Sequence, residues 1–162
     1  MRVSAFVSEY PGLSKRLATD ATLKHGGKET TVRALWDAGA TSTCISKDAV
    51  TALSLVPLGK RQMHTPSDVY TANTYQIDIL LPNNVIARDF VVCDSEIGTQ
   101  GLGMLIGMDI ISQGDFAVSN YNGKTVFTFR TPSQERTDYV KKIKIQKTIG
   151  LPHGKGKRSN NK

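Results

Sequence analysis

Turn signals divide this sequence into many short runs rich in β-branched residues, and no other feature restricts its fold as strongly. One run extends from Val69 to Leu81 and ends at Pro82-Asn83-Asn84. Tyr121-Asn122-Gly123 separates two alternating runs, and Asn-Gly in that setting is the strongest short signal for a β-hairpin. Before Pro132, only residues 46–53 and 108–113 have the features of short helices. The pattern predicts a mostly β domain: a compact, closed, antiparallel barrel-like fold with one or two short helices.

Positive charge is concentrated at the C-terminal end of the chain. Residues 136–162 carry nine Lys or Arg and one acidic residue, whereas residues 1–135 carry twelve basic and thirteen acidic residues. The part expected to fold is therefore close to neutral. Because apolar residues become sparse beyond Pro132, we expect a folded domain over residues 1–132. Residues 133–162 are expected to form a basic helix and tail, partly disordered.

The sequence also restricts location and cofactors. The first ten residues lack a long apolar run, and no stretch approaches the roughly 18 apolar residues that a membrane span needs. We therefore expect a soluble, cytoplasmic protein without a membrane partner. The two cysteines, Cys44 and Cys93, are too few for a disulfide framework and lack metal-ligand spacing, so both are expected to be reduced packing residues. Neither a metal nor another cofactor is predicted.

The stretch that most suggests chemistry is Ala34-Leu35-Trp36-Asp37-Ala38-Gly39-Ala40-Thr41-Ser42. It places Asp37 between a hydrophobic strand and a run of small residues, where burying a carboxylate is costly unless it has a partner or a function. Gly39 allows a sharp turn that can point amides toward the carboxylate. Ala38 and Ala40 leave room for a substrate backbone. The alternative is an aspartate that simply starts a turn after a strand, and the isolated tripeptide does not decide between the two.

Three elements in order resemble the retropepsin family, which comprises the retroviral-type aspartic proteases and their bacterial relatives. The first is Leu35-Trp36-Asp37-Ala38-Gly39-Ala40-Thr41, similar to the family motif of two apolar residues, Asp, Thr or Ser, Gly and Ala. The second is the region from Gln62 to Tyr75, which has a turn signal at Thr65–Asp68 and occupies the place of the family's β-hairpin flap. The third is Leu105-Ile106-Gly107 followed by a predicted short helix. Together they span roughly residues 1–130.

The resemblance implies an aspartic endopeptidase that acts on polypeptides as a homodimer. Each copy would supply one catalytic aspartate, Asp37, in an active-site loop that includes Ala38, Gly39, Ala40 and Thr41. The charged carboxylate of the pair would activate a water, and the protonated one would polarise the peptide carbonyl. The residues expected to contact substrate, from the flap and the wall of the cleft, are His64, Thr65, Pro66, Ser67, Ile106, Gly107 and Met108.

Ala38 departs from the family pattern, whose Thr or Ser hydroxyl at this position hydrogen-bonds across the dimer axis. Its absence favours a weaker dimer or a looser site. Two other functions stay open: a catalytically weak or inactive peptide-binding pseudo-protease, and a nucleic-acid-associated protein acting through its basic tail. Nucleic acid is expected as a partner only through residues 136–162. Asp109 and Asp115 lack the setting of Asp37 and are interpreted as a helix cap and a turn residue.

Overall fold

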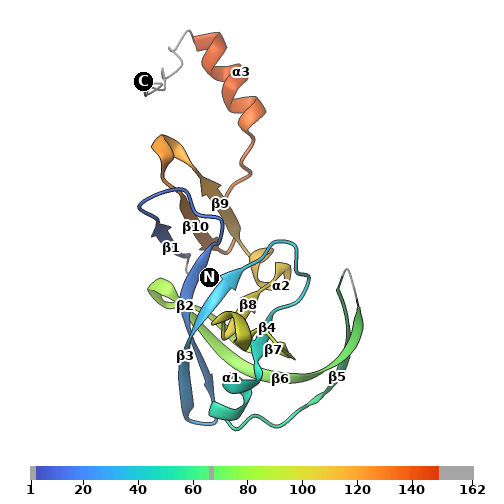
Figure 1. Cartoon of the computed structure of the whole chain (residues 1–162). Helices are drawn as coiled ribbons and strands as arrows, with labels where there is room; N and C mark the ends of the chain where they lie inside the picture. The colour runs from blue at the N-terminus through green and yellow to red at the C-terminus, as the bar shows by residue number, and fades with distance from the viewer. Residues whose placement is uncertain (1–2, 66–67, 150–162) are drawn as a thin grey trace, which may run out of the picture.

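The computed structural model describes residues 3–65 and 68–149, which form two sheets and three α-helices (Figure 1). The smaller sheet has the strand order β1-β10-β9, with β1 (Ser4–Glu9), β10 (Val126–Thr131) and β9 (Asp115–Ser119). The larger sheet has the order β2-β3-β8-β4-β7-β6-β5. Its strands are β2 (Ala18–His25), β3 (Lys28–Trp36), β8 (Met104–Ile106), β4 (Cys44–Ser46), β7 (Val85–Ser95), β6 (Val69–Leu81) and β5 (Gly59–His64). Because β2 also pairs with β6, the larger sheet closes on itself as a barrel.

The helices are few and short, as the sequence predicts. They are α1 (Lys47–Ala52), α2 (Met108–Ile111) and α3 (Tyr139–Ile149), with 3₁₀ turns η1 (Pro82–Asn84), η2 (Gly98–Gln100) and η3 (Tyr121–Gly123). Ser46 caps α1 as expected, because its hydroxyl oxygen accepts a hydrogen bond from the amide of Ala49 at 3.2 Å.

The predicted hairpins form where the turn residues permit them. Gly26 and Gly27 adopt φ of 54° and 79° between β2 and β3, and Asn122 and Gly123 adopt 52° and 73° between β9 and β10. This left-handed region is open to glycine and tolerated by asparagine. The first hairpin ends at Trp36 and so delivers Asp37 directly after a strand.

The mostly β, barrel-like prediction is confirmed, but the pairing is not entirely antiparallel. β3 pairs with β8, and β4 pairs with β7, in parallel. These strands lie far apart in the sequence, so no tight turn fixes their relative direction. In the β3–β8 register Trp36 is opposite Ile106, and the next residues, Asp37 and Gly107, therefore leave the sheet side by side.

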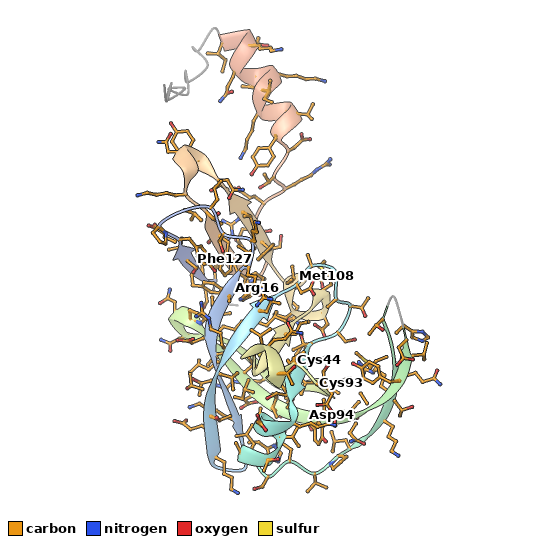
Figure 2. All side chains as sticks on the ribbon, viewed as in Figure 1. Arg16, Cys44, Cys93, Asp94, Met108 and Phe127 are labelled. Atoms are coloured by element: carbon orange, nitrogen blue, oxygen red, sulfur yellow. The ribbon has the colours of Figure 1, made fainter. Side chains whose placement is uncertain are left out.

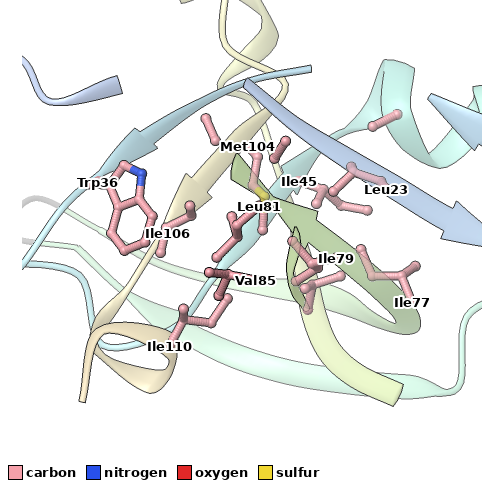
Figure 3. Packing of buried hydrophobic residues seen from close by; sticks show 14 of the residues in the cluster. Leu23, Trp36, Ile45, Ile77, Ile79, Leu81, Val85, Met104, Ile106 and Ile110 are labelled. Carbon is pink, nitrogen blue, oxygen red and sulfur yellow. The ribbon is translucent and has the colours of Figure 1, made fainter. Parts of the chain in front are cut away.

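Two parts of one core hold this end of the barrel in place. Aliphatic side chains fill the barrel interior, and Ile45, Ile79, Met104 and Ile106 are fully buried there (Figure 3). Aromatic side chains join the smaller sheet to β3: Trp36 stacks on Phe116 at a centroid distance of 5.8 Å. The indole Nε1 donates to the Thr19 hydroxyl at 3.0 Å. Truncating a tryptophan buried like this costs about 3–5 kcal/mol of stability. Trp36 therefore anchors the end of β3 that directly precedes Asp37.

The C-terminal helix α3 stands apart from both sheets, and none of its residues is buried (Figure 1). The polar residues 150–162, expected to be partly disordered, lie outside the described residues. Among the described helices, none has the length and apolar composition needed to cross a membrane.

Candidate active site

Asp37 occupies a tight turn at the end of β3 and is half-exposed. Its backbone amide donates to the carbonyl of Ile106 at 2.9 Å, which ties the turn to β8. Its carboxylate oxygen Oδ1 accepts the amide of Gly39 at 2.8 Å. A Cβ at Gly39 would lie 3.1 Å from the same oxygen, tighter than most such contacts. The turn thus orients the carboxylate with a backbone donor while leaving part of it open to a reacting group.

A second loop interlocks with this turn at Gly107. The amide of Met108 donates to the carbonyl of Ala40 at 2.8 Å. A Cβ at Gly107 would lie 2.7 Å from the carbonyl carbon of Ser42 and 3.0 Å from the Ala40 oxygen. Since Cβ atoms do not approach backbone this closely, only glycine fits, and the two loops form one unit. Ala38 and Thr41 are exposed on this unit, and Met108 is 37% exposed.

Ile106 lies elsewhere than the sequence interpretation supposed. Its side chain has no exposed surface and belongs to the core, because alternation along β8 turns it inward. It supports Gly107 from beneath and offers no wall to a substrate. The exposed Met108 remains available in that role.

A long hairpin formed by β5 and β6 faces the loops, in the place predicted for a flap (Figure 1). The amide of Thr65 donates to the carbonyl of Asp68 at 2.8 Å, which joins the ends of the two strands. His64 and Thr65 are exposed there, and Pro66 and Ser67 lie outside the described residues. Next to its tip, this flap therefore presents the polar side chains of His64 and Thr65.

The inner side of the flap packs over two thiols. Met63 and Tyr70 lie against a small buried cluster of Cys44, Ala72 and Cys93. Both cysteines are free, as predicted, and they are opposite each other in the β4–β7 pairing (Figure 2). Burial raises the pKa of the Cys44 thiol to about 12 and also raises the pKa of Cys93. These thiols are therefore protonated, weak nucleophiles that serve packing.

Beside this cluster, a cavity of about 570 Å³ lies between the flap and the segment that follows β7. Thr65, Tyr70 and Glu96 are among the residues that line it. A larger groove of about 760 Å³ lies along β1 and β2 and shares no residue with the loops around Asp37. The smaller cavity also contains no residue of these loops, but Thr65, Tyr70 and Thr71 of the flap line it. Within the described residues, no group of three or more His, Cys, Asp or Glu is arranged to hold a metal ion.

Comparison with solved structures identifies the fold. The crystal structure of a retropepsin-like aspartic protease from Rickettsia conorii matches 81% of this chain and 98% of its own, with a TM-score of 0.52 and 13% identity. The chain has the retropepsin-like fold. Two viral proteases match at lower TM-scores: that of EIAV (0.48, 17% identity, 64% of this chain and 90% of its own) and that of simian foamy virus (0.42, 20%, 59% and 92%). No protein-family model and no curated protein matches the sequence.

Within this retropepsin-like fold, a carboxylate brace that the sequence did not reveal joins the two loops. Asp109 accepts the amide of Thr43 at 2.8 Å through Oδ2 and the Thr43 hydroxyl at 2.6 Å through Oδ1. The same hydroxyl accepts the amide of Gly107 at 3.1 Å. Gly107, not Asp109, is the N-cap of α2, but the Asp109 carboxylate does accept the first-turn amide of Ile110 at 2.9 Å in addition to reaching across to the other loop. Asp115 is not a turn residue but begins β9.

A second unforeseen carboxylate fixes the base of the flap in the retropepsin-like fold. Asp94, buried on β7, accepts the amide and the side-chain Nδ2 of Asn73 at 2.8 and 3.0 Å, and the Tyr75 hydroxyl at 3.2 Å. Burial, and then the charge of Asp94, raise the pKa of Tyr75, so the phenol stays a donor. The flap is therefore anchored at its base and exposed at its tip. In the sequence Asp94 only follows the apolar residues Val91-Val92-Cys93, and that pattern does not indicate this role.

Proposed function

We propose that the protein is an aspartic endopeptidase that acts as a homodimer, with Asp37 from each copy at the centre of the site. The observation that carries the proposal is a half-exposed carboxylate held by the Gly39 amide between two interlocked loops, opposite a flap. Two other aspartates near these loops are already engaged: Asp109 with Thr43, and Asp115 with Arg130 at 2.6 Å. Asp37 is thus the carboxylate with capacity for a reacting water.

The chemistry follows from bringing two such carboxylates together. Like charges a few Å apart cannot both ionise easily, so the pair shares one proton. The ionised group takes a proton from water as the oxygen attacks the peptide carbonyl carbon, while the protonated group hydrogen-bonds the carbonyl oxygen. The tetrahedral intermediate then breaks its C–N bond as a proton passes to the leaving nitrogen. The products are a carboxylic acid and an amine.

The fold offers a strand edge for this dimer next to the loops. Three residues separate β9 from α2, and among the described residues the backbone of β9 pairs only with β10. β1, at the other edge of the sheet, already has the carbonyl of Ala5 bonded to the Asn83 side chain. An open edge is a template for pairing with another chain. We propose that the β9 edges of two copies pair across the dimer axis.

The activity test is hydrolysis of an unfolded polypeptide at mildly acidic pH. We expect cleavage that a statine-type inhibitor blocks and that Asp37→Asn abolishes. Asp89→Asn is the matched control, since Asp89 is exposed and its φ of 49° suits asparagine. Peptide binding without turnover in the wild-type protein would instead support a pseudo-protease, the alternative that Ala38 leaves open.

The edge test uses sedimentation. A lysine at Val118, which is 38% exposed on β9, should weaken the dimer, because β9 pairing would bring the two charges close together. The matched control is Val7→Lys on β1, where Val7 is 59% exposed. Equal dimerisation of both variants would refute pairing through the β9 edge. The proposed proteolytic activity would still be tested separately by the cleavage assay.

A further inference from the structure

Helix α3 is a charged element that the proposed proteolytic site does not use. Its eleven residues contain four lysines and no acidic residue. Five apolar side chains are 46–63% exposed on it, and the side chains extend into solvent around the helix (Figure 2). They are Tyr139, Val140, Ile143, Ile145 and Ile149. A helix of this length is marginal in water without packing, so contact with another molecule would stabilise it.

The apolar side chains do not form one face. With 3.6 residues per turn, Val140 and Ile143 lie on one side of the helix, and Ile145 and Ile149 lie on another. A helix that lies in a membrane interface needs a single wide apolar face. A helix that covers an apolar groove has the same requirement. What α3 presents on every side is positive charge.

The lysines of α3 also repel one another. Lys141, Lys144 and Lys147 follow at intervals of three, so neighbours in this series lie on the same face. Like charges at this spacing destabilise a helix. Asp138, before the helix, accepts the amide of Lys141 at 2.9 Å but cannot neutralise the series. A polyanion along the helix would remove the repulsion.

We propose that helix α3 binds the phosphate backbone of nucleic acid. The described residues 136–149, which include α3, have a net charge of +4 from five basic residues and one acid. Tyr139 is 63% exposed, and Lys142 Nζ lies 5.7 Å from its ring centroid. An exposed aromatic ring among cations offers a base a stacking surface next to its phosphates, which favours nucleic acid over an acidic protein.

The test is fluorescence anisotropy of the full chain with a labelled single-stranded RNA of about 20 nucleotides. If the four lysines of α3 each neutralise one phosphate, the log–log slope of affinity against salt is about −2.8 or steeper. Affinity then falls about 50-fold or more between 50 and 200 mM salt. Replacing Lys141, Lys144 and Lys147 together by Gln should reduce the magnitude of the slope by about 2.

A matched control carries the same charge change on the folded domain. Lys15, Lys24 and Lys28 are exposed, and replacing all three by Gln should leave RNA affinity unchanged. In the α3 variant, far-UV circular dichroism without RNA should show unchanged or increased helicity, because the repulsion is gone. The proposal would be overturned if both variants lost RNA affinity equally. It would also be overturned if the protein bound phosphatidylserine vesicles or polyglutamate as tightly as RNA. Both lysine variants should cleave peptide as the wild-type protein does.

Discussion

The brace between the two loops yields the sharpest stability prediction, the replacement of Asp109 by Ala. The substitution removes the acceptor of two hydrogen bonds from Thr43, at 2.8 and 2.6 Å, and Thr43 is fully buried. Hydrogen bonds to a charged group contribute about 1.5–3 kcal/mol each, and a buried donor left without a partner costs a similar amount. Because Asp109 is itself half-exposed, we expect the lower end of this range, about 3 kcal/mol in total.

Urea unfolding followed by the fluorescence of Trp36, the single tryptophan, measures this loss. With a slope of about 2 kcal/mol per M, the midpoint should fall by about 1.5 M while the slope stays constant. Asp109→Asn should lie between the wild type and Asp109→Ala, because its amide can accept from the Thr43 amide but leaves the Thr43 hydroxyl proton unpaired. A midpoint for Asp109→Ala within about 0.3 M of the wild type would refute the brace.

Three further predictions follow from single contacts. The Ser133 hydroxyl, then a backbone amide and a guanidinium, hold the pKa of Asp115 well below its usual value. Its charge therefore stabilises the fold above about pH 4, and this stabilisation is lost as the pH falls. In thermal melts, the Tm of Asp115→Asn should fall less with decreasing pH than the Tm of the wild type, and an equal fall would contradict this. Restoring a hydroxyl with Ala38→Thr should tighten dimerisation or raise cleavage, and no change in either would show that the missing hydroxyl is unimportant. Cys44 and Cys93 should resist a disulfide reagent at pH 8 in the native protein and react in urea, whereas fast native labelling would contradict their burial.

The sequence predicts this fold best where structure depends on neighbouring residues. Gly26-Gly27 and Asn122-Gly123 specify their hairpins because few other residues adopt positive φ. Ser46 begins α1 for an equally local reason, a side-chain oxygen that accepts a free amide. The turn at Asp37 belongs to the same class, since its amide donor, Gly39, is two residues away.

What the sequence does not predict depends on contacts across the chain. The parallel register of β3 and β8 joins residues about seventy positions apart and leaves no local pattern. The same is true of the bond between Thr43 and Asp109, and of the burial of Ile106, which follows from where β8 enters the barrel. An alternating apolar run shows that one face of a strand is buried but not which neighbour covers it.

The most direct measurement of the central claim is the activity of mixed subunits. Wild-type protein and Asp37→Asn are unfolded together in equal amounts, refolded, and assayed for peptide cleavage at a constant total concentration. If each site needs a carboxylate from both copies, random pairing leaves about one quarter of the wild-type activity, because only pairs of two wild-type chains are active. About one half would mean that each chain works alone, and would contradict a site built from two Asp37 carboxylates.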